Sequence, residues 1–257
     1  MLNFKNTNII FTVLLTVLIG VHSKLGLPVY IYLLLLVVYS LIVFYGCYYV
    51  GSNFFIPIVC SANTDKKEIA ISFDDGPAIN HTPAILQLLR QQNIKATFFC
   101  IGNRIAGNEN LIKQIVAEGH VIGNHSYSHH FWFDLFSAKK MLVDMQLMDA
   151  TIKKVTGLQP KLFRPPYGVT NPNIKKAIIT GGYTPVGWSV RSMDTVIKDE
   201  EKLLHKINAA LKPGAVFLFH DTSATTLQVL PAFIKEVKSK GYQIIPLNKL
   251  LHLMPYA

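Results

Sequence analysis

The sequence predicts an α/β fold with parallel strands, a barrel or a doubly wound sheet, that follows a membrane-spanning helical hairpin. Two long uncharged stretches lie before residue 65. After residue 66, seven short apolar runs alternate with six helical patterns, which is typical of consecutive βαβ units. Ionisable side chains follow five of these runs, at the strand ends where such folds place their active sites.

The N-terminal region is apolar enough to enter a membrane. Between residues 6 and 64 the only charged residue is Lys24. A spanning helix needs about 20 apolar residues. The run 27–50 meets this length and carries tyrosines near both ends, as interfacial segments do. The shorter run 8–22 is a second span or the apolar part of a signal peptide cleaved near Val21 and Ser23. We favour an uncleaved hairpin, because the second run follows almost at once.

The chain therefore divides into a membrane anchor, residues 1–60, and a second domain, residues 61–257. Polar residues 61–68 are expected to form the linker. A hairpin places both ends of the chain on one side of the bilayer. Lys5 and Lys24 do not decide which side, since the positive-inside rule needs a clear excess of basic residues in one loop.

Composition narrows the function classes and the compartment. The net charge is +10, but no basic patch is interleaved with aromatic residues, which argues against nucleic-acid binding. A basic surface toward anionic lipid or an acidic glycan, or a merely solvated one, is expected instead. Cys47, Cys60 and Cys100 form no C-x-x-C pair, so a cysteine zinc site is not expected. Free thiols are the preferred state, and a Cys60–Cys100 bridge is the alternative.

Strand and helix patterns alternate through the second domain. The expected strands are 68–73, 95–101, 120–124, 161–165, 183–190, 215–219 and 242–247. The expected helices are 83–92, 108–118, 137–156, 171–180, 199–211 and 225–240. Thr82 followed by Pro83 is typical of an N-cap and a first-turn proline.

Candidate site residues gather at the carboxyl ends of five expected strands. They are Asp74 and Asp75 after the first, His125 and His129 after the third, Arg164 and Tyr167 after the fourth, Asp194 beyond the fifth, and His220 and Asp221 after the sixth. Such residues in register on five strands indicate one shared site.

The stretch "NHSYSHH" resembles a metal-binding segment. His125 and His129 are four residues apart, so one helical turn would bring both rings to one face. Two histidines and a carboxylate suit zinc and leave a coordination position for water. Pairing of His125 with His130 is the alternative, although that spacing separates the rings more.

Asp74 and Asp75 stand side by side before Gly76-Pro77. Side chains alternate along a strand, so Asp74 should face the same way as Ser72, while the turn frees Asp75 from the alternation. Asp75 could then bind a cation and Asp74 act on the water beside it. The cation would also make the paired charges tolerable. The simpler interpretation is a helix-capping aspartate with a solvated neighbour.

The remaining candidates support this chemistry. The Arg164 guanidinium suits holding Asp74 in its charged form, and the Tyr167 N–H in a proline-fixed loop suits an oxyanion. His220 could protonate a leaving group while Asp194 orients its ring. Trp188 and Leu218 are candidates for the wall of a sugar pocket, although packing within the strands is the default interpretation for both. Asp221 is expected only to cap the following turn.

The motifs "SFDDGP", "HSYSH", "RPPY", the fifth-strand Asp194 and "LFH" occur in the order found in polysaccharide deacetylases, carbohydrate esterase family 4. The chain resembles this family over about residues 66–250. The resemblance implies a distorted (β/α) barrel of about seven units. It also implies Asp75, His125 and His129 as ligands of zinc or another divalent ion such as cobalt, Asp74 as general base, Arg164 as its orienter, Tyr167 as oxyanion donor, and His220 as general acid tuned by Asp194.

The fourth motif departs from the family pattern. It usually reads Asp-x-x-Asp-Trp, whereas "RSMDT" retains only the second aspartate, with Arg191 and Thr195 in the other places. The departure concerns the support of the acid and one wall of the sugar site.

The expected function is a membrane-anchored, metal-dependent hydrolase that removes an N-acetyl group from amino sugars of a cell-envelope or extracellular glycan, peptidoglycan or chitooligosaccharide-like. The alternatives are a deacylase of a lipid-linked amino sugar and a catalytically silent glycan-binding module. A glycosidase is disfavoured, since its two carboxyl groups stand on opposite sides of the bond that is cleaved. The resemblance implies an extracytoplasmic domain; the oligomeric state stays undetermined.

Overall fold

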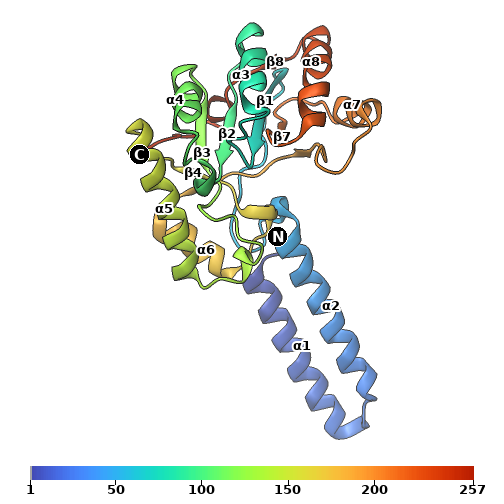
Figure 1. The fold of residues 1–257 in the computed structure, drawn as a ribbon. Coiled ribbons are helices and arrows are strands. Elements are labelled where there is room, and N and C mark those ends of the chain that lie inside the picture. Colours follow the sequence, from blue (N-terminus) through green and yellow to red (C-terminus); the bar gives the residue numbers. More distant parts are fainter. Residues whose placement is uncertain (1) are drawn as a thin grey trace.

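The computed structural model describes residues 2–257, which form a helical hairpin and an α/β domain (Figure 1). Helices α1 (Phe4–Leu25) and α2 (Val29–Tyr48) lie side by side and project away from the domain. Both are long and apolar enough to cross a membrane. At 1.5 Å per residue each extends about 30 Å, the thickness of the hydrocarbon core.

The hairpin helices differ by a few residues from the expected spans. Helix α1 begins four residues earlier than expected, because the Asn3 side chain accepts a hydrogen bond from the N–H of Asn6 at 2.9 Å and caps the helix. Helix α2 ends at Tyr48 rather than residue 50. Two tyrosines join the helices: the Tyr39 hydroxyl donates to Asn8 at 2.8 Å and the Tyr32 hydroxyl to the Leu18 carbonyl at 3.1 Å.

The domain alternates strands and helices as expected. The strands are β1 (Glu68–Asp74), β2 (Thr97–Cys100), β3 (Val121–Asn124), β4 (Leu162–Phe163), β5 (Thr184–Pro185), β6 (Val190–Arg191), β7 (Val216–His220) and β8 (Gln243–Ile244). The helices are α3 (Thr82–Gln91), α4 (Glu109–Ala117), α5 (Ala138–Thr156), α6 (Pro172–Gly181), α7 (Glu200–Ala209), α8 (Ala224–Ser239) and α9 (Leu247–Leu250). The order β5-β4-β3-β2-β1-β7-β6, with β8 beside β1, is parallel throughout. The predicted distorted (β/α) barrel of about seven units is confirmed.

One expected strand, 183–190, is wrong as a single element. It forms two short strands, β5 and β6, separated by residues 186–189. The carbonyl groups of Val186 and Gly187 accept hydrogen bonds from the Arg164 side chain at 3.3 and 2.7 Å. These carbonyls therefore leave the regular ladder, and the chain bends between the two strands.

The gap at β5 and β6 is closed by residues 59–62, at the boundary between the expected anchor and the expected linker. Val59 forms a parallel bridge to Val186, and Ser61 forms an antiparallel bridge to Ala215. Residues 59–62 therefore complete the wall of the barrel, while the division of the chain at residue 60 stays a prediction. The polar linker is effectively shorter than expected.

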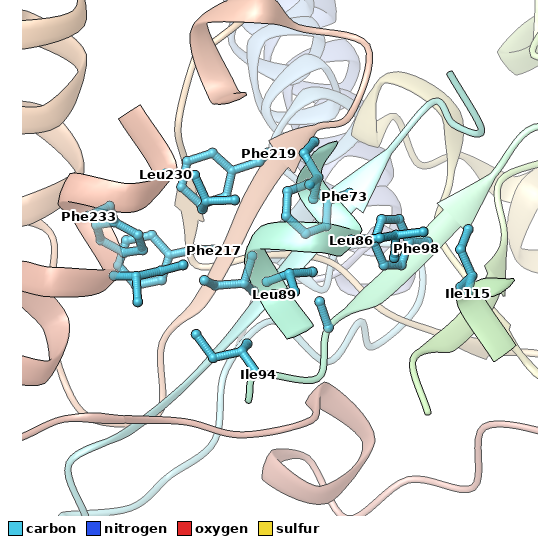
Figure 2. Packing of buried hydrophobic residues seen from close by; sticks show 14 of the residues in the cluster. Phe73, Leu86, Leu89, Ile94, Phe98, Ile115, Phe217, Phe219, Leu230 and Phe233 are labelled. Carbon is cyan, nitrogen blue, oxygen red and sulfur yellow. The ribbon is translucent and has the colours of Figure 1, made fainter. Parts of the chain in front are cut away.

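The main hydrophobic core lies between the sheet and helices α3, α4, α7 and α8 (Figure 2). Phenylalanines from three neighbouring strands, Phe73, Phe98 and Phe219, are at most 1% exposed and contact one another in the middle of this core. Each fully buried phenylalanine contributes about 1.5–3 kcal/mol. The core therefore fixes the position of β1 at the centre of the sheet.

Alternation along β1 determines which side chains reach the interior of the barrel. Ile69, Ile71 and Phe73 belong to the core beneath the helices. Ser72 and Asp74 therefore face the opposite way, as expected. Asp74 is paired in register with His220 on β7, so both side chains lie on this inner face.

The three cysteines, Cys47, Cys60 and Cys100, are all free. This confirms the expectation of free thiols over a Cys60–Cys100 bridge. Complete burial raises the pKa of Cys100 well above its usual value, so this thiol stays protonated and unreactive.

The hairpin is built into the domain rather than loosely tethered to it. Thr170 donates hydrogen bonds from its N–H to the Cys47 carbonyl at 2.9 Å and from its hydroxyl to the Gly46 carbonyl at 3.0 Å. Val50, Ile56 and Ile58, which follow α2, share a hydrophobic cluster with domain residues. The last turn of α2 therefore has a fixed position on the domain.

Gly46 is essential to this junction. A Cβ atom at Gly46 would lie 2.2 Å from Cδ1 of Phe54, a side chain that is 3% exposed. Gly46→Val is expected to displace Phe54 and to destabilise the domain by about 1–3 kcal/mol. Thermal unfolding in detergent and limited proteolysis of residues 50–66 measure the effect.

Gly20→Val is the matched control, since a Cβ there meets nothing within 4 Å. Equal melting temperatures and equal cleavage rates for the two variants would contradict a fixed junction.

Candidate active site

The predicted site residues come together at the carboxyl edge of the sheet. Asp74 ends β1, His125 follows β3, Arg164 follows β4, and His220 ends β7. These strands are neighbours or next neighbours in the order β4-β3-β2-β1-β7. Because all strands are parallel, their ends converge, and the site forms from segments that are far apart in the sequence.

Asp75, His125 and His129 form a cluster suited to a metal ion. Their ligand atoms all lie within 4.8 Å of one another. The Asp75 Oδ1 atom is 3.5 Å from His125 Nε2 and 3.4 Å from His129 Nε2. For metal–ligand bonds of about 2.0–2.2 Å, neighbouring ligands of a tetrahedral zinc ion stand about 3.3–3.5 Å apart. The three residues therefore fit a tetrahedral ion that keeps one open position.

The histidines meet through a loop and not through a helical turn. Ser126 and His129 have positive φ values of 66° and 43°, which a helix does not allow. The Ser126 hydroxyl oxygen accepts a hydrogen bond from the His129 N–H at 2.9 Å, and Asp144 Oδ1 accepts from the N–H groups of Tyr127 and Ser128. The predicted helical geometry is thus wrong, although the two rings still converge, with centroids 4.9 Å apart.

Both histidines present a free nitrogen to the cluster. His125 Nδ1 is 2.8 Å from the Arg164 carbonyl oxygen, which can only accept a hydrogen bond, so Nδ1 carries the proton and Nε2 is the free nitrogen. Burial and the neighbouring His125 lower the pKa of His129 to about 4. His129 is therefore neutral at neutral pH, which is the form that binds metals. His130 is exposed and its Nδ1 accepts from the N–H of Trp132 at 3.0 Å, so it does not join the cluster.

Asp74 is held by a fully buried arginine. Arg164 Nη1 donates to Asp74 Oδ1 at 2.7 Å and to the Ser72 hydroxyl oxygen at 2.8 Å. The guanidinium also lies 4.0 Å from the centre of the Phe99 ring. Burial lowers the pKa of Arg164, and the charge of Asp74 opposes this shift. Since Oδ1 is occupied by Arg164, Oδ2 is the carboxylate oxygen that remains available, 3.8 Å from His125 Nε2.

Partly buried His220, at the end of β7, and fully buried Asp194 form a second ion pair at this edge of the sheet. His220 Nδ1 lies 2.8 Å from Asp194 Oδ1, and the His220 N–H donates to Asp194 Oδ2 at 2.7 Å. Ser192 donates to Oδ1 at 2.8 Å, and the Thr226 hydroxyl donates to Oδ2. Burial disfavours the charged ring, but the hydrogen bond and charge of Asp194, with Asp74 and Asp75, outweigh it and raise the pKa of His220. The raised pKa favours the protonated ring, in which Nε2 carries a proton that it can donate.

Tyr167 lies beside the metal-type cluster. Its ring centroid is 4.7 Å from that of His129, and its hydroxyl donates to the His129 carbonyl at 3.4 Å. The neighbouring N–H groups of Gly168 and Val169 donate to the carbonyls of Pro165 and Pro166, whereas the Tyr167 N–H has no acceptor among the described residues. A positive φ of 60° turns the peptide at this point. This N–H is thus free to bind an oxyanion.

Trp188 and Leu218 occupy different environments. Trp188 is partly buried, its ring lies over Gly168, and the Arg164 guanidinium is 5.6 Å from its centre. Leu218 is 2% exposed and faces the same side of the sheet as Ser72, its partner in the register. Trp188 therefore has surface to offer a sugar, and Leu218 can contribute only a narrow part of an inner wall. The assignment of both to substrate binding stays a prediction.

Two expectations about capping are wrong. The N-cap of α3 is His81, not Thr82. The Thr82 hydroxyl instead donates to Asp221 Oδ2 at 2.6 Å, and the Asp221 carboxyl is completely buried against Gly76. Burial raises the pKa of Asp221 to about 7. Asp221 therefore does not cap the turn that follows it, as the sequence suggested, but supports the turn that carries Asp74 and Asp75. The only indication of this contact in the sequence is the adjacency of Asp221 to His220.

The family model described as polysaccharide deacetylase matches residues 61–186. The Listeria monocytogenes peptidoglycan-N-acetylglucosamine deacetylase PgdA is 33% identical over 202 residues, which are 79% of this chain and 42% of PgdA. The chain thus spans about two fifths of the length of this relative.

Two solved structures show the same fold. The Bc1960 peptidoglycan N-acetylglucosamine deacetylase is 30% identical, with a TM-score of 0.74 over 78% of this chain and 95% of that chain. BA3943 from Bacillus anthracis, a pseudoenzyme of the CE4 family, is 26% identical, with a TM-score of 0.70 over 75% and 68%. Sequence and fold agree, and the chain belongs to the polysaccharide deacetylase family, carbohydrate esterase family 4.

Proposed function

We propose that this chain is a metal-dependent hydrolase that removes the N-acetyl group from amino sugars of a cell-envelope or extracellular glycan. The observation that carries the proposal is that groups suited to metal binding, to proton acceptance and to proton donation occur at one edge of the sheet. A cluster fit for a divalent ion, a carboxylate held by buried Arg164 and a histidine held by Asp194 all lie at the carboxyl edge of the sheet. The names of PgdA and Bc1960, both peptidoglycan N-acetylglucosamine deacetylases, support an amide of an amino sugar as the bond that is cleaved.

Asp75, His125 and His129 would hold the ion, zinc in the first place and cobalt or another divalent ion in the second. Such an ion supplies a Lewis acid for the amide carbonyl and for water. The residues of the chain supply proton transfer and orientation. Trp188, Leu218 and the Tyr167 ring are proposed to position the sugar.

Asp74 is proposed to accept the proton of the attacking water through Oδ2, while Arg164 keeps the carboxylate charged. A new carbon–oxygen bond then forms, and the Tyr167 N–H donates to the oxygen on which negative charge develops. His220 donates its Nε2 proton to the nitrogen as the carbon–nitrogen bond breaks. The products are acetate and the free amine of the sugar.

The hairpin is proposed to anchor the chain in a bilayer with the domain on the extracytoplasmic side. Two observations favour this arrangement: two helices of spanning length, and relatives named for peptidoglycan, an extracytoplasmic glycan. A lipid-linked amino sugar is the second candidate substrate, because the hairpin is docked directly on the domain. A catalytically silent module is the third candidate, since BA3943 shows that the family includes pseudoenzymes.

Asp74→Asn tests the general base. Loss of the proton acceptor is expected to lower kcat by about 10²–10⁴-fold on N-acetylated glycan oligosaccharides, measured as acetate release. Metal content should persist, because Asp74 is not one of the proposed ligands. Asp65→Asn, an exposed acid before β1, is the control. A fully active Asp74→Asn enzyme would exclude this role.

Metal binding is tested by removing one ligand at a time. Asp75→Asn and His129→Gln are each expected to weaken zinc binding by about 100-fold or more, measured by calorimetry on the chelator-treated protein. His130→Gln should bind normally, since His130 lies outside the cluster. Activity should return when zinc is added after chelation. Unchanged affinity in the Asp75 and His129 variants would refute the proposed ligand set.

Asp194→Asn tests the tuning of His220. A raised pKa keeps His220 protonated to higher pH, and activity should fall as pH rises through that pKa. Without the carboxylate the pKa falls, so the alkaline limb of the kcat profile is expected to move to lower pH. Asp199→Asn, which retains a helix-capping side chain on the surface, should leave the limb in place. A limb that does not move in Asp194→Asn would mean that another group donates the proton.

A further inference from the structure

We propose that the loop beside the active-site mouth rests on the bilayer, so that the enzyme acts on amino sugars held at the membrane surface. The contact surface is an apolar rim made of Phe131, Trp132 and Leu135, which are 68%, 55% and 69% exposed. This inference rests on the N-deacetylation chemistry of the proposed function and on the anchoring by the hairpin, and it selects the second of the candidate substrates named there. The apolar rim contacts the interfacial layer of the lipid bilayer.

The junction with α2 determines how the catalytic loops are positioned relative to the bilayer surface. Thr170 donates to the carbonyls of Gly46 and Cys47, which belong to the last turn of a helix that ends at Tyr48. If α2 spans the hydrocarbon core, this last turn lies at the interface. Exposed Tyr45 and Tyr48 agree with such a depth, because tyrosines gather at the boundary of the bilayer. Thr170 and its loop therefore lie at the level of the lipid headgroups.

The apolar rim is tied to the loop that carries Thr170. The Asn171 side chain donates to the Asp134 carbonyl at 2.6 Å, and Asn173 donates to the Phe136 carbonyl at 3.1 Å. Asp134 and Phe136 flank Leu135, so the rim is held beside the end of the hairpin. Aromatic and aliphatic side chains exposed at this depth are typical of residues that enter the interface.

The apolar rim also borders the site itself. The Phe131 ring centroid is 6.5 Å from that of Tyr167, and Tyr167 contacts His129 of the metal-type cluster. The loop 167–170 thus contacts α2 through Thr170 and the proposed metal ligand His129 through Tyr167. A substrate anchored in the bilayer would meet the site directly.

The fixed junction limits how far the site can reach. Val50, Ile56 and Ile58 are at most 7% exposed and pack with Phe133 and Phe163 of the domain. A flexible tether would let the domain sample glycan strands far from the membrane, whereas this junction holds it at one height. The substrate class that suits this arrangement is an N-acylated amino sugar attached to a lipid.

Trp132 provides a test that does not depend on activity. The full chain is placed in nanodiscs made with lipids brominated near the carbonyl end of the chains, which quench tryptophan by contact. The only other tryptophan is Trp188. Subtracting the emission of Trp132→Phe from that of the wild type gives the fluorescence of Trp132. This fluorescence should be much weaker in brominated nanodiscs than in nanodiscs without bromine.

Met254 is the control position at which a tryptophan should lie away from the bilayer. It is 74% exposed, and the adjacent Pro255 carbonyl accepts from Lys161 at the amino end of β4, the edge opposite the site. A tryptophan placed there by Met254→Trp in the Trp132→Phe background should not be quenched. An unquenched Trp132 signal, or equal quenching at the two positions, would overturn the proposed contact.

A second arm tests the substrate class. The triple variant Phe131→Ser, Trp132→Ser, Leu135→Ser is assayed in nanodiscs on a lipid-anchored N-acetylglucosamine probe and on a soluble chitooligosaccharide. The rate on the lipid probe should fall by about tenfold or more, with the soluble rate unchanged. Equal changes on both substrates would overturn the inference. Absence of any turnover by the wild type would instead refute the proposed function, and the quenching result would still decide the membrane contact.

Discussion

The buried ion pair of Arg164 and Asp74 is the interaction on which the site depends. Both side chains are at most 3% exposed, where an unpaired charge would cost several kcal/mol. Arg164 is compensated by four hydrogen bonds, to Asp74, Ser72, Val186 and Gly187. Its own carbonyl oxygen orients His125. One residue thus joins the proposed base, a proposed metal ligand and the bend that divides β5 from β6.

This arrangement explains why so much unusual backbone gathers at the site. Among the described residues, eight non-glycine positions have positive φ, and four of them are Asp75, Ser126, His129 and Tyr167. Each such conformation costs roughly 1 kcal/mol or more and persists only where surrounding contacts determine it. The contacts here are specific: the Ser126 hydroxyl holds His129, and the Tyr167 hydroxyl bonds to the same loop. The loop that carries the metal-type cluster is therefore held in place by hydrogen bonds from its neighbours.

The sequence predicted the architecture well, because alternation and spacing are local properties. The central β1, most helices and the two apolar helices lie within a few residues of their expected positions. Contacts that join distant segments left no local signal. The bend after Pro185 depends on Arg164, the pairing of Thr82 with Asp221 spans 139 residues, and the docking of Thr170 on α2 spans more than 120. The histidine pair converges as expected, but through a loop whose shape depends on Asp144.

The departure in the fourth motif acquires a physical meaning from these contacts. Asp194 does not need a second acid to stay charged and oriented, since Ser192, Thr226 and His220 all donate to it. The loss of the first aspartate therefore leaves the proposed acid intact.

The replacement of the first aspartate of this motif by Arg191 has a different consequence. The Arg191 guanidinium lies 5.8 Å from the centre of the Trp188 ring. Where the family pattern has a negative charge, this chain has an exposed positive one beside a proposed wall of the sugar site. A phosphate next to the sugar, as in a lipid-linked substrate, would be attracted to that charge, whereas a neutral chitooligosaccharide would not. The altered motif and the proposed position of the site at the membrane surface thus favour the same class of substrate on independent grounds.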